Sequence, residues 1–432
     1  MKLIERRLNV FFYDNYVGQL LQVQGGDLAF EYDEAYLESG GIAISYALPM
    51  QNDRLEGKEV KAFFSGILPD EAVRERLARQ IGVSEKNPFA LLNAIGGECA
   101  GAISIHPLED AEQVRSKKES SSDSFAIPLS KTDVLALLQR LEQRPLLAGE
   151  NGLRLSLAGA QEKLAVIYQN EQIHLSKGDA PTTHILKPPL QRLEDSCFNE
   201  LFCMRLAHAM GFETPHTFLY WAEETPCYLV ERYDRIRHKD GSIQRLHQED
   251  FCQALGIVPE QKYESEGGPS IQACLTLLDN ASMHPAKDKM AFLDRIIFNY
   301  LIGNTDAHGK NFSLLYESKK ARLAPMYDLL SLAIYPAFDS RMAMHIGGRK
   351  NPDELLLRHW HRLVPNTKLA QRNLEKRLLK LAKETPQKAE VLKESLKQEA
   401  FQSTIFDRII ALIHKRSQRL IELCKSAKPY TI

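Results

Sequence analysis

Apolar and polar positions along the chain follow two patterns, and the first of these predicts β-strands. Residues 8–32, LNVFFYDNYVGQLLQVQGGDLAFEY, are short aromatic and β-branched runs separated by the turn-forming groups DN and QGGD. This pattern is typical of an antiparallel meander. A further strand is expected after the glycine-rich turn in 95–106. Strands return between 153 and 187, in the segments LRLSL, KLAVIY, QIHL and THILK.

The second pattern, with apolar residues three and four positions apart, predicts helices. One is expected at 70–82, where acidic residues lie in the first turn and Gly82 at the end, and another at 130–143. From residue 196 onward helices dominate, at 196–210, 249–256, 270–280, 287–302, 352–362 and 368–428, the last broken at Pro386. Strands that are segregated from helices indicate an α+β fold and not a sheet of alternating βαβ units.

One segment lacks both patterns. Residues 108–124, LEDAEQVRSKKESSSDS, are charged, rich in serine and without aromatic residues, so they cannot bury enough apolar surface to hold one conformation. We interpret this region as an exposed linker. The predicted organisation is a β-containing module at 1–108, a linker at 109–130, a β-rich unit at 131–247 and a helical unit at 248–432.

Composition narrows the class of protein. The chain has 432 residues, 44% of them hydrophobic, which is enough for two or three subdomains. Neither a signal peptide nor an apolar run of roughly 18 residues is present, so we expect a soluble cytoplasmic protein with no membrane partner. Seven scattered cysteines without CxxC spacing indicate reduced thiols, neither a zinc site nor a disulfide framework.

Net charge gives no general signal for nucleic acid, since it is −1 over the whole chain. The charge is uneven, however, because residues 366–432 contain 15 Lys and Arg against 7 Asp and Glu. This basic region would suit an anionic partner. The simpler interpretation is a solvated helical face with surplus lysine.

The strongest candidate for chemistry is GNTDAHGKNFS, residues 303–313, between the predicted helix 287–302 and the apolar run FSLLY. The buried face expected of that helix would anchor the turn, which holds Asp306 and Asn311 five positions apart. Asp328 follows seventeen positions after Asn311, in MYDLLS. Phosphoryl transfer needs a carboxylate beside the attacking hydroxyl, and an Asn and a second Asp to hold Mg²⁺. Protein kinases use the same spacing in their catalytic loop.

Other parts needed by a kinase lie upstream in the expected order. Lys187 ends the strand THILK, where a phosphate-binding lysine is expected, and SLAGAQEK joins two strands through small residues. Glu200, on the helix 196–210, is a candidate partner for Lys187. The segment YLVERYDR, 228–235, would be a hinge whose backbone bonds adenine.

Simpler interpretations exist for these residues. Asp306 and Asn311 alone could close a turn, as Asx side chains often do. Asp306 and His308 could belong to a transition-metal site, although no third ligand stands at a diagnostic spacing. Lys187 and Asp328, in the right order, favour phosphoryl transfer, with small-molecule phosphotransfer as a weaker alternative.

The chain resembles the HipA family of bacterial toxin kinases, the partners of HipB-type antitoxins. The motifs that carry the resemblance are SLAGAQEK, THILK, the NE of FNELF, VERYDR, QEDFCQALG, KYESEGGP, GNTDAHGKNFS and MYDLLS. Weaker support comes from FFSGILPDEAVRERL and IGGECAGAISI. The resemblance implies a two-lobed, protein-kinase-like fold that binds ATP and Mg²⁺ between a β-rich lobe and a helical lobe.

The resemblance also implies roles for single residues. Asp306 would be the catalytic base, Asn311 and Asp328 the metal ligands, Lys187 a phosphate ligand, and Ser156 the site of autophosphorylation. The remaining nucleotide-binding candidates are Ala158, Gly159, Ala160, Gln161, Glu162 and Lys163 in the loop over ATP, Glu231, Arg232 and Tyr233 in the hinge, Gln248, His308 and Tyr327 around the nucleotide, and Gly309 and Lys310 beside Asn311.

Two hypotheses for function follow. In the first, the protein is an ATP- and Mg²⁺-dependent serine/threonine kinase, the toxin of a toxin–antitoxin pair, whose substrate is a translation component such as an aminoacyl-tRNA synthetase. In the second, it is a corepressor that joins a helix-turn-helix antitoxin on operator DNA, and is therefore associated with the nucleoid. Both can hold for one protein.

Overall fold

A computed structural model describes residues 2–13, 15–110, 126–141, 143–148, 154–176, 181–317, 319–399 and 401–426. Most of the predicted linker, 111–125, lies outside the described residues. The chain forms two compact units. The first unit comprises Met1–Pro188, Tyr220–Gln261 and Ser313–Arg322, and the second comprises Pro189–Leu219, Lys262–Phe312 and Leu323–Ile432. The sequence modules 1–108, 131–247 and 248–432 stay a prediction.

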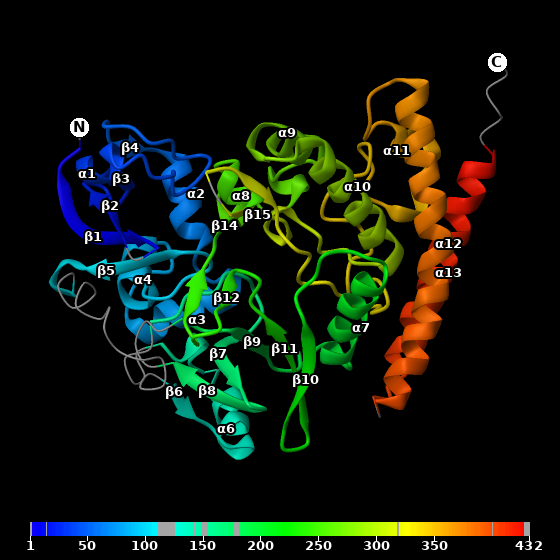
Figure 1. Ribbon diagram of the computed structural model, residues 1–432, viewed down its shortest axis with the longest axis horizontal. Coiled ribbons are helices and arrows are strands. Elements are labelled where there is room, and N and C mark those ends of the chain that lie inside the picture. The colour runs from blue at the N-terminus through cyan, green and yellow to red at the C-terminus, as the bar shows by residue number, and fades with distance from the viewer. Residues whose placement is uncertain are drawn as a thin grey trace. The chain divides into compact units, whose positions relative to one another are not determined.

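A five-stranded sheet in the order β4-β3-β2-β1-β5 opens the first unit (Figure 1). Its strands are β1 (Ile4–Phe12), β2 (Asn15–Val23), β3 (Leu28–Tyr32), β4 (Leu55–Glu56) and β5 (Ile103–Pro107), and the neighbouring helices are α1 (Glu34–Glu38), α2 (Lys58–Gly66), α3 (Glu71–Ile81) and α4 (Pro88–Ile95). β2 pairs antiparallel with both β1 and β3, which confirms the predicted meander. α3 confirms the helix predicted at 70–82, and Gly82 ends it with a φ of 76° that favours glycine.

A second, six-stranded sheet has the order β10-β11-β9-β7-β8-β6. Its strands are β6 (Ala126–Pro128), β7 (Leu164–Gln169), β8 (Gln172–Ser176), β9 (His184–Lys187), β10 (Thr217–Ala222) and β11 (Thr225–Glu231), with α6 (Lys131–Leu141) between β6 and β7. Three of the four strands predicted between 153 and 187 are confirmed. The fourth, LRLSL, is wrong, because the backbone of Glu98 bonds Arg154 and Ser156 and leaves Leu155 only an isolated bridge.

Both sheets contribute to one hydrophobic core. Phe30 and Phe64 come from the N-terminal part of the first unit, and Val166 and Leu229 from the six-stranded sheet, and all four are buried in the same cluster. At about 25 cal/mol per Å² of buried apolar surface, such a shared core is the main force that holds the two sheets together. The sheets therefore form one body.

Short elements complete the first unit. They are the hairpin β12 (Arg235–Arg237) with β13 (Ile243–Arg245), the three-stranded sheet β14 (His247–Asp250), β15 (Ser313–Tyr316) and β16 (Ala321–Leu323), whose last residue lies in the second unit, and the helix α8 (Phe251–Ala254). Single 3₁₀ turns lie at Leu108–Asp110, Pro145–Leu147, Pro259–Gln261, Glu264–Glu266, Gly309–Asn311 and Pro352–Glu354, the last three of them in the second unit.

Helices dominate the second unit, as predicted. They are α7 (Ser196–Ala209), α9 (Ile271–Ala281), α10 (Pro285–Ile302), α11 (Leu357–His361), α12 (Lys368–Gln398) and α13 (Ile405–Ser426). α12 and α13, orange and red in Figure 1, lie side by side. Together with the antiparallel sheets, these helices confirm the α+β class.

Three predicted boundaries are wrong. Glu249 and Asp250 belong to β14, because they pair with β15, and α8 begins only at Phe251. The segment 352–362 holds a 3₁₀ turn and the short helix α11 in place of one helix. α12 continues through Pro386, which is buried in it; its packing on α7, α10 and α13 compensates for the backbone hydrogen bond that proline removes. The helical segment 368–428 is instead interrupted between Gln398 and Ile405.

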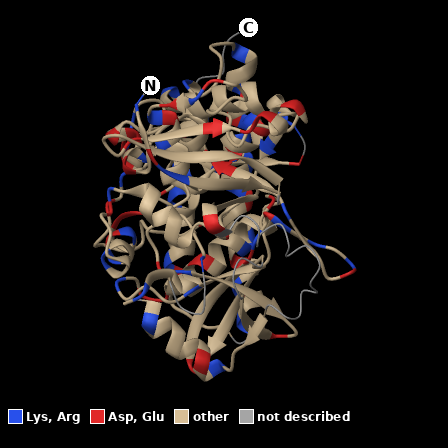
Figure 2. Cartoon of the chain, turned by 90° about the vertical axis from the view of Figure 1, so that its left-hand side faces the viewer, with Lys and Arg blue, Asp and Glu red and all other residues tan. Residues whose placement is uncertain are grey.

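Charged residues of both signs are interspersed along the chain (Figure 2). Among the described residues, no helix combines the length and the apolarity that crossing a lipid bilayer requires. All seven cysteines are free thiols, and six of them are buried.

Candidate functional site

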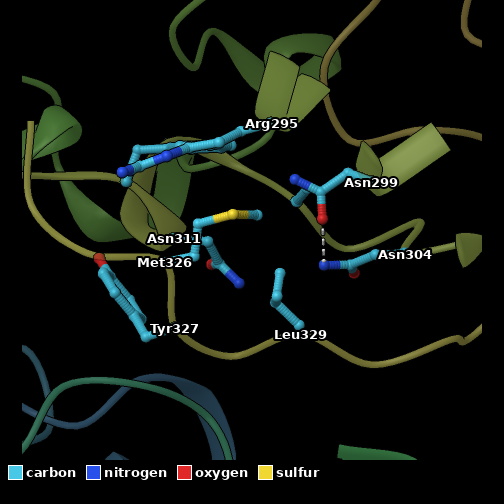
Figure 3. Close-up of a pocket in the computed structure, with 9 residues that line it drawn as sticks. Arg295, Asn299, Asn304, Asn311, Met326, Tyr327 and Leu329 are labelled. Atoms are coloured by element: carbon cyan, nitrogen blue, oxygen red, sulfur yellow. Dashed lines mark hydrogen bonds between the residues drawn. The ribbon is translucent and has the colours of Figure 1, made fainter. Parts of the chain in front are cut away.

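The loop 303–311 in the second unit is fastened to the helix that precedes it. Gly303 ends α10 with a φ of 79°, a left-handed conformation that reverses the chain. Asn304 donates its side-chain N–H to Asn299 Oδ1 at 2.9 Å, and accepts the backbone N–H of Asp306 at 3.2 Å. Figure 3 shows this pair of asparagines beside Asn311. The loop therefore has little freedom to move relative to α10.

Asp306 presents its carboxylate to solvent, since its side chain is 42% exposed. Its Oδ1 accepts a hydrogen bond from the Tyr263 hydroxyl at 2.8 Å. His308 Nε2 lies 3.9 Å from the other oxygen, Oδ2, which is too far for a hydrogen bond. A partly exposed carboxylate whose Oδ1 is held by a phenol is placed to bond a hydroxyl that approaches from solution.

His308, by contrast, is buried. Burial, together with the ammonium groups of Lys262 and Lys310, lowers the pKa of its imidazole to about 3. The ring is therefore neutral at physiological pH. Its Nδ1 has no hydrogen-bond partner within the described residues, so His308 gives the loop 303–311 a buried group with unused hydrogen-bonding capacity.

Asn311 and Asp328 lie close together, as the spacing predicts for two metal ligands. Asn311 Nδ2 donates to Asp328 Oδ2 at 3.3 Å. Asp328 has a φ of 57°, a left-handed conformation that is costly for a residue with a side chain and is often found at functional sites. The Tyr327 hydroxyl donates to the carbonyl oxygen of Lys310 at 2.7 Å, which holds the two segments together.

The donor atoms here fit a hard divalent cation. Carboxylate and amide oxygens are the ligands that Mg²⁺ prefers, with water and phosphate oxygens completing its shell. Within the described parts of the chain, no three His, Cys, Asp or Glu side chains cluster around a possible metal position, so the transition-metal interpretation of Asp306 and His308 gains no third ligand.

A small cavity lies behind the loop (Figure 3). Its volume is about 10 Å³, and its lining includes Asn299, Asn304, Asn311 and Arg295. This space suits one water molecule with several polar partners and is far too small for a nucleotide. The amide of Asn311 thus borders this cavity.

In the first unit, the loop 158–163 is tied down at several points. Gly159 has a φ of 111°, and its carbonyl accepts the backbone N–H of Asp70 at 3.1 Å. Lys163 Nζ donates to the carbonyl of Ala158 at 2.8 Å, and Glu162 forms an ion pair with Arg76. Gln161 donates to the carbonyl of Pro188 at 3.5 Å. The segment is therefore an ordered loop.

Lys187 is buried, 5% exposed, at the end of β9. It stands opposite Tyr228 of β11, and its ammonium lies 5.6 Å from the centre of the Tyr228 ring, a distance at which a cation and an aromatic face attract. Lys187 and Glu200 belong to different units, so their pairing stays a prediction.

The hinge candidates Glu231 and Tyr233 are held by different contacts, the first by strand pairing and the second by its side chain. Glu231 pairs with His184 across the strands β11 and β9. The hydroxyl of Tyr233 donates to Gln248, whose amide in turn donates to Asp234 at 3.4 Å. Gln248 is thus part of a polar chain within the first unit.

The Arg232 side chain has structural partners that the sequence did not reveal. It donates to Glu98 Oε1 at 2.8 Å, to Asp234 Oδ1 at 3.0 Å and to the carbonyl of Cys99 at 3.0 Å. Arg235 bonds the same Glu98 oxygen at 2.8 Å. Glu98, Arg232, Asp234 and Arg235 together form a fully buried ionic cluster. The guanidinium of Arg232 is committed to this cluster, and its backbone N–H donates to the carbonyl of Thr183 at 2.9 Å, so its contact with a nucleotide stays a prediction.

Ser156 is completely buried, with a relative exposure of 0%. Its hydroxyl donates to the carbonyl of Ile67 at 2.9 Å, and its backbone N–H to the carbonyl of Glu98 at 2.8 Å. In this conformation the hydroxyl is inaccessible to any phosphoryl donor.

Two residues that position the loop were not identified from sequence. Asn304 belongs to the motif GNTDAHGKNFS and Tyr263 to the motif KYESEGGP, and neither motif indicates which side chain these residues contact. Because Tyr263 lies 43 positions before Asp306, no local spacing reveals their contact.

Comparisons with known proteins cover both units. The HipA N-terminal domain profile matches residues 8–106 and the HipA-like C-terminal domain profile matches residues 155–389. Protein Y4mE of Sinorhizobium fredii is 44% identical over 356 residues, 82% of this chain and 84% of Y4mE. The serine/threonine-protein kinase toxin HipA of Shewanella oneidensis is 28% identical over 393 residues, 88% of each chain. The structure of Shewanella oneidensis HipA with HipB and its operator DNA superposes with a TM-score of 0.81 at 25% identity, covering 98% of this chain and 100% of that one.

Proposed function

The chain belongs to the HipA family of serine/threonine kinases, and we propose that it transfers the γ-phosphoryl group of ATP to a serine or threonine hydroxyl with the help of Mg²⁺. The observation that carries the proposal is the arrangement in the second unit: an exposed Asp306 carboxylate on a fixed loop that also holds Asn311 3.3 Å from Asp328. These are the parts that phosphoryl transfer requires.

Each group has a defined task in the transfer. The substrate Oγ forms a bond to the γ-phosphorus while the bond from that phosphorus to the β–γ bridging oxygen breaks, and ADP leaves. Asp306 orients the attacking hydroxyl and accepts its proton. Asn311 and Asp328 would hold Mg²⁺, which when bound neutralises charge on the phosphates. For Asn311 to do so, its amide must turn its oxygen toward the cation.

Membership of the family supports assigning the nucleotide contacts to further residues. Lys187 would bind a phosphate, and the backbone of the loop 158–163 would cover it. The backbone of Glu231, Arg232 and Tyr233 would bond adenine, and Gln248 would line the nucleotide. Four residues of the second unit would also line the nucleotide: His308, Gly309, Lys310 and Tyr327. The buried, neutral His308 would meet the nucleotide as a hydrogen-bonding group and not as a cation.

Replacing the base tests this proposal. We expect Asp306→Asn to lower phosphate incorporation from labelled ATP by about 10²- to 10⁴-fold, the usual contribution of a general base. The matched control is Asp279→Asn, which removes an exposed carboxylate of the same unit that pairs with Lys289, and we expect it to keep wild-type activity. A wild-type protein from a phosphatase-treated preparation that neither bound ATP nor gained phosphate would contradict the proposal.

We also propose that Ser156 is autophosphorylated and that the modification inhibits the enzyme. The family assignment suggests the site, and burial gives the physical consequence. A phosphate adds nearly two negative charges, which cannot stay at a position with 0% exposure without a large desolvation cost. The segment around Ser156 must therefore leave its place when it is modified, together with the adjoining loop 158–163.

Peptide mapping after incubation with Mg²⁺ and ATP checks this. A phosphopeptide containing Ser156 should appear in the wild type and disappear in Ser156→Ala. In Ser104→Ala, which changes another buried serine of the first unit, the phosphopeptide should persist. Hydrogen exchange over 154–163 should increase in the phosphorylated protein, and equal exchange before and after modification would exclude the displacement.

The physiological role that we propose is that of a growth-arresting toxin, whose substrate is a translation component such as an aminoacyl-tRNA synthetase. The kinase toxin HipA of Shewanella oneidensis, 28% identical to this chain, supports the toxin role. Incubating the active kinase with purified synthetases and labelled ATP tests the substrate. Label in a synthetase with wild type, and its absence with Asp306→Asn, is the expected result.

A second function, that of a corepressor, is favoured by one observation. The solved HipA that superposes on this chain with a TM-score of 0.81 was captured with HipB and operator DNA. We propose that this protein likewise joins a HipB-type helix-turn-helix antitoxin on its operator, and so resides at the nucleoid. Mobility shifts at increasing salt should show a complex that Asp306→Asn still forms, which would separate this role from catalysis.

A further inference from the structure

We infer that Tyr263 is a positioning residue for the catalytic carboxylate: its hydroxyl fixes the orientation of Asp306 and stabilises the ionised form that accepts the substrate proton. The inference rests on the proposed kinase function and adds a residue to its machinery. Its basis is the 2.8 Å hydrogen bond from the Tyr263 hydroxyl to Asp306 Oδ1.

The backbone on both sides of Tyr263 is bound to the catalytic loop or to a segment that adjoins it. The carbonyl of Lys262 accepts the N–H of Gly309 at 3.4 Å. The N–H of Glu264 donates to the carbonyl of Ala343 at 3.2 Å, and the N–H of Ala343 donates to the carbonyl of Thr305 at 2.9 Å. The segment that carries Tyr263 is thereby fastened on both sides of Asp306.

The ring of Tyr263 is also held in place. It meets the His308 ring edge to face, with centroids 5.2 Å apart and an angle of 80°, a favourable aromatic geometry. The hydroxyl therefore reaches Asp306 from a fixed direction, and the side chain of Asp306 remains 42% exposed toward solvent. Preorganised donors of this kind contribute to catalysis because they need no rearrangement during the reaction.

The titratable groups near Asp306 determine whether this bond depends on pH. The groups near Asp306 include the Tyr263 hydroxyl and His308, and those that act on His308 include Lys262, Lys310 and Asp328. His308 is neutral and therefore adds no positive charge beside the carboxylate of Asp306. The phenol of Tyr263 keeps its proton at neutral pH, so it donates its hydrogen bond whatever the protonation state of His308. A hydrogen bond to a carboxylate favours its ionised form, so loss of the phenol should make Asp306 titrate at a higher pH.

Tyr263→Phe removes the hydroxyl and keeps the ring against His308. We expect kcat to fall by about tenfold to a hundredfold, as for the loss of a hydrogen bond to a charged group, while KM for ATP changes by less than about twofold. The acidic limb of the pH–rate profile should move toward higher pH. Tyr263→3-fluorotyrosine, which retains a hydroxyl and strengthens it as a donor, should restore kcat.

The matched control is Tyr335→Phe. Tyr335 is a buried tyrosine of the same unit whose hydroxyl donates to the carbonyl of Glu194 at 2.7 Å and accepts from Asn199. Its loss should lower the thermal unfolding temperature and leave the pH–rate profile unchanged.

A measurement without turnover separates this inference from the proposed function. In protein labelled with ¹³C at aspartate carboxyls, the Asp306 resonance, identified by its absence in Asp306→Asn, should titrate at a higher pH in Tyr263→Phe than in wild type. The positioning role would be overturned if the titration of Asp306 were unchanged in Tyr263→Phe. It would also be overturned if Tyr263→Phe lost kcat but, like Tyr335→Phe, kept the wild-type pH–rate profile. A shifted titration in a protein that transfers no phosphate would support the contact and refute the kinase function.

Discussion

At the scale of single residues, the groups of the candidate site are held in contrasting ways. Asp306 is exposed and bonded by a phenol, His308 is buried and neutral, and Asp328 adopts a left-handed backbone conformation with a φ of 57°. Such a conformation costs a residue with a side chain on the order of 1 kcal/mol. The strain fixes the position of a carboxylate at the expense of stability, which agrees with the metal-binding role that we propose for Asp328.

Because the backbone of Asp328 is strained, we expect its replacement by glycine to change stability and activity in opposite directions. Asp328→Gly should raise the free energy of unfolding by about 0.5–1 kcal/mol, since glycine adopts positive φ without strain, while phosphate transfer is lost with the carboxylate. Asp328→Asn is the control, because it removes the charge and keeps the strain, so activity should fall without a gain in stability. Urea unfolding and a transfer assay measure the two quantities. Equal stability of the Gly and Asn variants would show that the conformation is not strained.

At the scale of elements, the sequence predicted the type of most helices and strands, and the structure brings Asn311 and Asp328 together. It failed where tertiary contacts override local signals. Pro386 predicts a break that packing of α12 suppresses, and Glu249 joins a helical pattern although it pairs with β15. The Arg232 side chain could not be assigned, because its partner Glu98 lies 134 positions away. Motif spacing specifies local geometry, but it does not indicate which charged residues that are distant in sequence will form an ion pair.

The buried ionic cluster of Glu98, Arg232, Asp234 and Arg235 leads to a prediction about stability. Glu98→Gln should lower the free energy of unfolding by about 3–5 kcal/mol, because it leaves Asp234 as the one carboxylate of the cluster to compensate the buried guanidinium groups of Arg232 and Arg235. Glu317→Gln is a control in the same unit, since Glu317 pairs with Arg322 at the surface, where an ion pair contributes little. Urea unfolding of both variants measures the difference. A Glu98→Gln protein as stable as the control would show that the cluster contributes specificity of structure and not stability.

At the scale of the whole molecule, buried titratable groups link folding to pH in opposite directions. Burial lowers the pKa of His184 and His247 to about 4 each, so protonation in the unfolded state reduces stability as the pH falls below about 6.5. Glu249 acts in the opposite sense. Its carboxylate accepts hydrogen bonds from Ser45 at 2.5 Å, from the backbone of Tyr46 at 2.8 Å and from the Tyr316 hydroxyl, yet burial raises its pKa to about 7.

Glu249 therefore determines how stability changes between weakly acidic and neutral pH. Because the folded state holds its proton more tightly than the unfolded state, its contribution is complete below about pH 4.5 and is lost as the pH rises through 7. Glu249→Gln cannot titrate, so its free energy of unfolding relative to wild type should rise by up to about 3 kcal/mol between pH 4.5 and pH 7.5 and then stay constant. Using the difference between the two proteins cancels the histidine contributions, which both share. Urea unfolding at half-unit pH intervals provides the curve, and a difference that did not change with pH would show that folding does not shift the pKa of Glu249.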